Sequence, residues 1–315
     1  MQGAFREHEF LSWLRDQTRS TGQLIPVPLG DDAALIAGTE GLLIAMDTVC
    51  EGSHAASGPD LPEQLARKAV RSNLSDIAAM GGRAETVLCA LELPRRATAE
   101  LAKRTMRAIL AECARYAVTL VGGDTVVRDG PMAITVTVTG RLLGAPVLRS
   151  GARPGELIVV TGELGGSLAG RHHDFEPRLD EAAWLVAAGP PTAMTDISDG
   201  LVRDLANILV ASGCGAVLDA AAIPCSMAAQ DLSQTSGRRP LDHALEDGED
   251  FELLFTWPAS GRARLEQDWK FGTPLHVIGH ITEAGLGLME QGAVRDLPVR
   301  GFEHRSEPEN PHVDS

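Results

Sequence analysis

Six short acidic motifs, most of them built with glycine, alanine or serine, recur along both halves of the chain. They occupy residues 30–34 (Gly-Asp-Asp-Ala-Ala), 42–47 (an apolar run ending in Asp47), 73–82 (Asn-Leu-Ser-Asp-Ile-Ala-Ala-Met-Gly-Gly), 122–125 (Gly-Gly-Asp-Thr), 196–200 (Asp-Ile-Ser-Asp-Gly) and 248–250 (Gly-Glu-Asp). Turn geometry or helix N-capping explains any single one of these acids. Six together are hard to assign to unrelated turns, so we expect a fold in which both halves contribute to one acidic site.

The apolar patterning predicts alternating strands and helices in both halves. Expected strands cover residues 42–47, 118–121, 132–139, 157–161, 251–256 and 275–278, and expected helices cover 62–80, 98–116 and 199–212. The strict alternation within 132–139 favours a half-buried strand in an antiparallel or mixed sheet. We therefore predict two α/β or α+β domains, 1–145 and 146–315, with the turn-rich stretch 149–155 at the start of the second.

Charge and cysteine usage limit the partners and the compartment. The formal net charge is -15 and there is no dense Lys/Arg run, which argues against a nucleic-acid partner. The five cysteines form no C-x-x-C pair, which is typical of reduced thiols in the cytosol. No apolar run approaches the ~20 residues that span a bilayer, and residues 1–15 lack the apolar stretch of a signal peptide. We expect a soluble, cytoplasmic protein with no membrane partner.

Converging aspartates would repel one another and so require cations. Oxygen ligands without a His/Cys cluster favour Mg²⁺, which is often shared with substrate phosphates. Such a site suits phosphoryl transfer, where metals and a positioned cation stabilise the transferring group. Arg149 is a candidate for that cation, although a surface arginine at a domain boundary is an equally good interpretation. We interpret the adjacent His172 and His173 as solvated loop side chains rather than as metal ligands, because no third ligand is evident.

Two large classes of phosphoryl-transfer enzyme are excluded by missing motifs. The chain has no G-x-x-x-x-G-K-[ST] loop, so it is not a P-loop enzyme. It has neither H-R-D nor D-F-G, so it is not a protein kinase.

In content and order the acidic motifs resemble those of the thiamine-monophosphate kinase family. The strings at 73–82 and at 248–255 (Gly-Glu-Asp-Phe-Glu-Leu-Leu-Phe) are the most specific, and 300–304 (Arg-Gly-Phe-Glu-His) resembles the closing motif of that family. Two features depart from the family pattern. Ala45 and Met46 stand where Ser or Thr is usual, and the segment 171–178 is shorter than expected.

The resemblance implies the two-domain fold of the aminoimidazole ribonucleotide synthetase superfamily. In that fold an N-terminal mixed sheet with helices pairs across a homodimer, and a C-terminal α/β domain follows. The implied enzyme transfers the γ-phosphoryl group of ATP to thiamine monophosphate with the help of Mg²⁺, giving thiamine diphosphate and ADP. Its small-molecule partners would be ATP and thiamine monophosphate.

On matching positions the resemblance also implies the site residues. The magnesium ligands would be Asp32, Asp47, Asp76, Asp124, Asp196 and Asp199. Gly123, Asp124, Arg149 and Ser198 would contact ATP, and His54, Glu249 and Phe302 would contact the thiamine phosphate. Asp47, Asp199 and Arg149 would act most directly in catalysis.

Two other functions stay open at this point. Ala45, Met46 and the short segment 171–178 are compatible with a different ATP-dependent synthetase of the same superfamily, acting on another phosphorylated substrate. They are also compatible with a nucleotide- or thiamine-phosphate-binding protein that has lost its metal sites and its activity.

Overall fold

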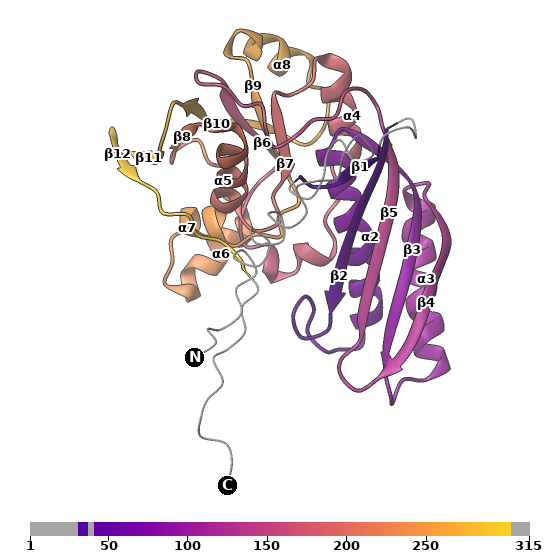
Figure 1. Ribbon diagram of the computed structural model, residues 1–315. Coiled ribbons are helices and arrows are strands. Elements are labelled where there is room, and N and C mark those ends of the chain that lie inside the picture. The colour runs from indigo at the N-terminus through magenta and orange to yellow at the C-terminus, as the bar shows by residue number, and fades with distance from the viewer. Residues whose placement is uncertain (1–30, 37–40, 304–315) are drawn as a thin grey trace, which may run out of the picture.

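The computed structural model describes residues 31–36 and 41–303, and it arranges them around two β-sheets (Figure 1). The five-stranded N-terminal sheet has the order β1 (Ala34–Ile36), β2 (Leu42–Cys50), β5 (Ala133–Leu142), β3 (Gly82–Pro94) and β4 (Thr119–Arg128). Its neighbouring strands are antiparallel except for the parallel pair β3 and β4. The sheet is therefore mixed, as the alternation within 132–139 predicted.

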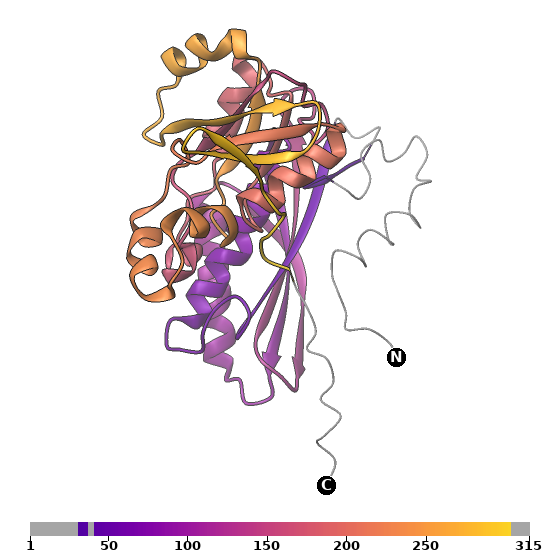
Figure 2. The same ribbon diagram turned by 90° about the vertical axis from the view of Figure 1, so that its left-hand side faces the viewer.

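Helices α2 (Leu61–Ala79) and α3 (Ala99–Arg115) cover one face of this sheet (Figure 2). Pro62 lies in the first turn of α2, and Thr98 caps α3 by accepting a hydrogen bond from the Leu101 N–H at 3.1 Å. Within the described residues no helix packs on the opposite face, where Met46 and Leu88 are 64% and 44% exposed. The N-terminal half therefore leaves one sheet face open.

The seven-stranded C-terminal sheet lies between two layers of helices. Its order is β12 (Ala293–Asp296), β11 (Leu286–Glu290), β8 (Gly215–Asp219), β10 (Leu275–Thr282), β6 (Leu157–Thr161), β9 (Leu253–Trp257) and β7 (Ala193–Asp196). Only β8 and β11 are parallel. One core contains α5 (Leu201–Ser212) and α7 (Pro240–Glu246), and the other contains α4 (Leu179–Ala188) and α8 (Arg262–Asp268). Helix α6 (Met227–Ser236) packs on α7, and short 3-10 turns lie at η2 (Ser167–Ala169), η3 (Arg171–His173) and η4 (Ala259–Gly261).

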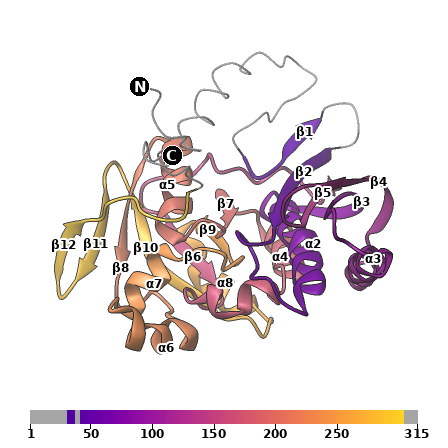
Figure 3. The same cartoon turned by 90° about the horizontal axis from the view of Figure 1, so that it is seen from below.

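Helix α2 joins the two halves. Its Ala78 lies in the same core as Leu185 of α4 and Met194 of β7, so this helix packs against both sheets. Figure 3 shows α2 beside α4, between the two sheets. Because β7 ends beside α2, the carboxyl end of a C-terminal strand meets the polar face of an N-terminal helix. The predicted two-domain mixed α/β fold is confirmed, while the boundary between 145 and 146 stays a prediction.

One predicted strand end is wrong. The strand expected at 118–121 was expected to end before the Gly-Gly-Asp-Thr string at 122–125, but β4 continues through that string to Arg128. A Cβ atom at Gly123 would collide with the carbonyl oxygen of Cys89 on β3. The glycine therefore allows two strands to approach closely instead of turning the chain.

None of the helices in the described part of the chain is both long and apolar enough to cross a membrane.

Candidate active site

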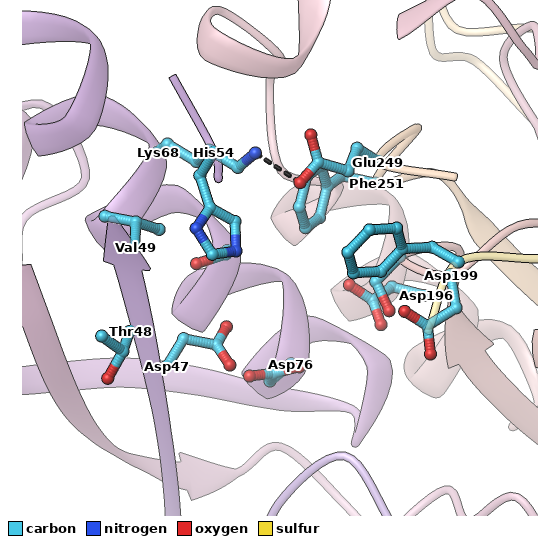
Figure 4. A pocket seen from close by; sticks show the side chains of 13 residues that line it. Asp47, Thr48, Val49, His54, Lys68, Asp76, Asp196, Asp199, Glu249 and Phe251 are labelled. Carbon is cyan, nitrogen blue, oxygen red and sulfur yellow. Dashed lines mark hydrogen bonds and ion pairs between the residues drawn. The ribbon is translucent and has the colours of Figure 1, made fainter. Parts of the chain in front are cut away.

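A pocket of about 210 Å³ lies between the two halves (Figure 4). Its lining residues are Asp47, Thr48, Val49, His54, Lys68, Ser72 and Asp76 from the N-terminal half, and Asp196, Ser198, Asp199, Glu249, Phe251 and Phe302 from the C-terminal half. Both halves thus contribute to one acidic pocket, as the recurrence of acidic motifs predicted. The predicted site residues in it are Asp47, His54, Asp76, Asp196, Ser198, Asp199, Glu249 and Phe302.

Three carboxylates converge beside this pocket. Asp32 precedes β1, Asp76 lies on α2 and Asp196 ends β7, and each offers one oxygen within 4.8 Å of the other two. Oδ2 of Asp196 accepts a hydrogen bond from Ser75 Oγ at 2.5 Å, whereas Oδ2 of Asp32 is buried and receives none from the described residues. An all-oxygen donor set with an unpaired buried oxygen fits Mg²⁺.

Burial opposes the ionised form of these acids. It raises the pKa of Asp196 to about 8, with repulsion by Asp32 adding to the shift. Burial, followed by repulsion from Asp47 and Asp196, raises the pKa of Asp76 well above the usual range. Burial also raises the pKa of Asp47, while Lys68 opposes that shift. The acid cluster therefore favours the uptake of protons or of cations.

Arg149 borders the same carboxylates. Its Nη2 donates to Oδ1 of Asp32 at 2.7 Å, and Thr195 Oγ1 donates to the same oxygen at 2.9 Å. The Arg149 side chain is only 18% exposed, so the interpretation as a surface arginine is wrong. The guanidinium is therefore a fixed positive charge beside the acid cluster, and its planar donor geometry suits phosphate.

A strained loop presents Glu249. Glu249 and Phe251 adopt positive φ values of 54° and 51°, which are costly for residues other than glycine. The Glu249 N–H donates to Ser198 O at 2.7 Å, and the Phe251 ring stacks on Phe175 with centroids 3.9 Å apart. These contacts hold the Glu249 side chain in the pocket, where its Oε2 is buried and unpaired among the described residues.

The turn to which this loop is hydrogen-bonded is itself held by a buried acid. The Asp204 carboxylate of α5 accepts the N–H groups of Ser198 and Asp199, each at 3.0 Å. On the N-terminal side, Nδ1 of His54 accepts the Cys50 N–H at 3.0 Å. Backbone anchors therefore orient the side chains on both walls of the pocket.

Gly123 and Asp124 do not join this pocket within one chain. They lie on β4, an exposed strand that β5 and β3 separate from β2, the strand carrying Asp47. Asp124 Oδ1 accepts the N–H of its neighbour Thr125 at 2.8 Å. Within one chain, the structure therefore does not bring these two residues to the predicted site.

Sequence reasoning missed Lys68, whose Nζ forms an ion pair with Oε1 of Glu249. The spacing of four between Lys68, Ser72 and Asp76 on α2 was the available signal, because it places all three on one helix face. The expectation of two solvated histidines was also wrong, since His172 is buried and its Nδ1 lies 2.8 Å from Ser167 O. Gly30 and His304 of the predicted motifs lie outside the described residues.

Comparison with known proteins agrees with this geometry. Residues 30–142 match the AIR synthase related protein N-terminal domain, and residues 153–288 match the AIR synthase related protein C-terminal domain. Thiamine-monophosphate kinase of Rhodopirellula baltica is 39% identical over 285 residues, covering 87% of this chain and 89% of that protein. The enzyme of the same name from Salmonella typhimurium is 34% identical over 325 residues, covering 93% and 96%.

Solved structures show the same relationship. One described as AaThiL complexed with AMPPCP and TMP superposes with a TM-score of 0.79 at 27% identity, covering 95% of this chain and 97% of that one. Thiamine monophosphate kinase from Aquifex aeolicus superposes with a TM-score of 0.75 at 26% identity, covering 92% and 99%. With these matches along nearly its whole length, the chain belongs to the thiamine-monophosphate kinase family.

Proposed function

We propose that this protein transfers the γ-phosphoryl group of ATP to thiamine monophosphate, forming thiamine diphosphate and ADP. The observation that carries the proposal is the pocket itself, in which acids from both halves of a family member surround one cavity. The relatives are named for this substrate, and one related structure is described with AMPPCP and TMP.

Five acids of this chain would hold Mg²⁺: Asp32, Asp47, Asp76, Asp196 and Asp199. Bound Mg²⁺ would neutralise phosphate charge and so favour the approach of two anionic substrates. Arg149 would contribute a fixed positive charge beside Asp32, and Ser198 would contact the nucleotide. His54, Glu249 and Phe302 would hold the thiamine phosphate on the opposite side.

The reaction itself needs little from side chains beyond placement. An oxygen of the acceptor phosphate attacks the γ-phosphorus, the bond between that phosphorus and the β,γ-bridging oxygen breaks, and ADP leaves with the bond's electron pair. The acceptor oxygen is already ionised at neutral pH, so a general base is not required. The walls of the pocket, fixed by Asp204 and by the Glu249 loop, would hold the donor and acceptor in line.

The active form is proposed to be a homodimer in which β4 of one copy completes the site of the other. Three strand spacings separate β2 from β4, a distance of about 14 Å within one sheet. Asp124 therefore cannot share a cation with Asp47 of its own chain. The open sheet face with Met46 and Leu88, and the exposed Val126 and Val127 of β4, support burial against a second copy.

The reaction would take place in the cytoplasm. In support, all five cysteines lie within the described residues and are free thiols.

The test is to give the purified protein ATP, MgCl₂ and thiamine monophosphate and to measure both ADP and thiamine diphosphate. Equal amounts of the two products are expected. ADP release with another phosphorylated acceptor and none with thiamine monophosphate would favour a different synthetase of the superfamily. Ligand binding without any turnover would instead indicate a non-catalytic homologue.

A further inference from the structure

Lys68 is a buried cation that lines the acidic pocket. Lys68 is 1% exposed, and it is the only lysine or arginine among the described pocket-lining residues. The acids around the same cavity are Asp47, Asp76, Asp196, Asp199 and Glu249. Lys68 therefore places a single positive charge among the carboxylates that line the pocket.

The position of Lys68 on α2 separates it from the acid cluster. Lys68, Ser72 and Asp76 follow one another at intervals of four residues and all line the pocket. Eight helical residues place Lys68 about 12 Å along the axis from Asp76. Figure 4 shows Lys68 and Glu249 toward the top of the view and Asp47 and Asp76 toward the bottom. The carboxylates suited to bind cations therefore lie at one end of the pocket, and the Lys68 ammonium lies at the other end.

The Lys68 ammonium has hydrogen-bonding capacity left over. It carries three N–H donors, and Oε1 of Glu249 is the one acceptor that it reaches among the described residues. Buried donors without acceptors are costly, so a ligand that supplies oxygen atoms would relieve this cost. A phosphate group supplies several oxygens and a negative charge in one compact group.

We infer that Lys68 binds the acceptor phosphate of thiamine monophosphate, and that it thereby selects phosphorylated over unphosphorylated thiamine. This inference rests on the proposed function. The acid cluster would hold the donor phosphates through its cations, which leaves Lys68 as the protein's own positive charge for the acceptor. Glu249 pairs with Lys68, and its second oxygen, buried and unpaired among the described residues, is available to the positively charged thiazolium ring.

The inference is tested by comparing two ligands that differ only in the phosphate. Binding of thiamine monophosphate and of thiamine is measured by calorimetry in the presence of MgCl₂ and AMPPCP, for wild type and Lys68→Met. Loss of a charge-assisted contact predicts about 10- to 100-fold weaker binding of thiamine monophosphate. Thiamine binding should change less than about twofold, because the thiazolium contact with Glu249 remains. Lys68→Arg should recover part of the lost affinity, since it keeps the charge.

Arg67→Met provides the matched control. Arg67 is a cation on the same helix and lies 3.7 Å from Asp174, but it does not line the pocket. Its replacement should leave the ratio of the two affinities unchanged. In kinetics, Lys68→Met should raise KM for thiamine monophosphate while KM for ATP stays within about twofold of wild type.

Two binding results would overturn the inference. Equal weakening of thiamine and thiamine monophosphate would show that Lys68 acts only by holding Glu249, and an unchanged affinity for thiamine monophosphate would show that it does not bind the phosphate. If Lys68→Met fails to fold, the double variant Lys68→Met/Glu249→Gln is compared with the single variant Glu249→Gln. Neither of these two variants carries the Glu249 carboxylate, so neither leaves it buried without its partner. A wild-type protein that phosphorylates thiamine monophosphate while Lys68 variants keep full selectivity would refute this inference alone. Wild type without any such activity would refute the proposed function as well.

Discussion

Burial, more than any single neighbour, sets the charge state of the site carboxylates. It is the largest cause of the raised pKa of Asp47, Asp76 and Asp196, and repulsion from neighbouring acids, Asp32 among them, adds to it. Neutralising one of them removes repulsion between the carboxylates, but it also removes a proposed ligand for a cation. Stability and activity should therefore respond in opposite directions to the same substitution.

Asp47→Asn is the first test of this opposition. Because one charge is lost from a shared metal cluster, we expect kcat to fall by about 100-fold or more. The melting temperature without Mg²⁺ should stay the same or rise, since Asn needs no counter-charge. Rates of ADP release and circular dichroism measure the two effects. An unchanged kcat would show that Asp47 is not part of the metal cluster.

The raised pKa values also predict how stability depends on pH. Between the ordinary aspartate pKa of 3.8 and the raised value of about 8, folded Asp196 holds a proton that the unfolded chain releases. The folded state then binds more protons, so the free energy of unfolding falls as pH rises through this window. Bound Mg²⁺ should oppose that loss by replacing the protons.

Melting temperatures in EDTA and in MgCl₂, at pH 5 and pH 8, measure this effect. Stabilisation by Mg²⁺ should be clearly larger at pH 8. The variant Asp196→Asn should show a smaller fall with pH in EDTA. Equal stabilisation at both pH values would contradict the assignment of these acids as metal ligands.

At the scale of elements, β4 is the strand that carries predicted site residues away from the pocket of its own chain. The Gly-Gly-Asp-Thr string at 122–125 lies inside β4, on the exposed edge of the sheet. Gly123 is required because β3 approaches it closely, and Asp124 is exposed. An exposed strand edge is normally protected or paired, so a second copy is the expected partner.

Mixing two inactive variants tests whether sites are shared between copies. Asp47→Asn and Asp124→Asn should each be nearly inactive as homodimers. In a heterodimer one of the two sites would hold both wild-type residues, so an equal mixture that exchanges subunits should recover about one quarter of wild-type activity.

The matched control mixes Asp47→Asn with Asp196→Asn. Both residues line the same pocket of one chain, so every heterodimer site carries a substitution and activity should not return. Recovery in this control, or none in the first mixture, would show that Asp124 does not act across a dimer.

At the scale of the whole molecule, a buried arginine ties the halves together through α2. Arg71 is 1% exposed, and its Nε donates to Oε2 of Glu112 on α3 at 2.8 Å. Its Nη1 donates to Phe175 O at 2.6 Å, in the segment that leads into α4. Since Phe175 stacks on Phe251, this contact also supports the loop that presents Glu249.

Arg71→Met should therefore destabilise the protein by about 3–5 kcal/mol, because it leaves the Glu112 carboxylate buried without its partner. Urea unfolding measures the loss. Arg71→Met/Glu112→Leu should recover part of it. Arg107→Met, which breaks the exposed pair with Glu100, should cost less than about 0.5 kcal/mol. A loss of the same small size for Arg71→Met would show that the buried contacts of Arg71 contribute no more than an exposed ion pair.

Local patterns in the sequence were sufficient for most elements. Helix α2 was expected at 62–80 and spans Leu61–Ala79, and α3 begins after Thr98 as its capping chemistry required. Such features depend on neighbours within a few residues. The Gly-Gly-Asp-Thr string was placed wrongly because Gly123 is needed where the strand passes close to the Cys89 carbonyl of β3. No local pattern in the sequence shows that contact.

The sequence by itself determined the family, the mixed α/β class and the list of acids that could form a site. Only the tertiary structure decided which of them meet: Asp32, Asp76 and Asp196 converge, whereas Asp124 lies across two strands from Asp47. Only the structure placed Lys68 opposite Glu249. The physical reason is that distances across a pocket depend on strand order and on how the two halves pack, and contacts far apart in the chain set both.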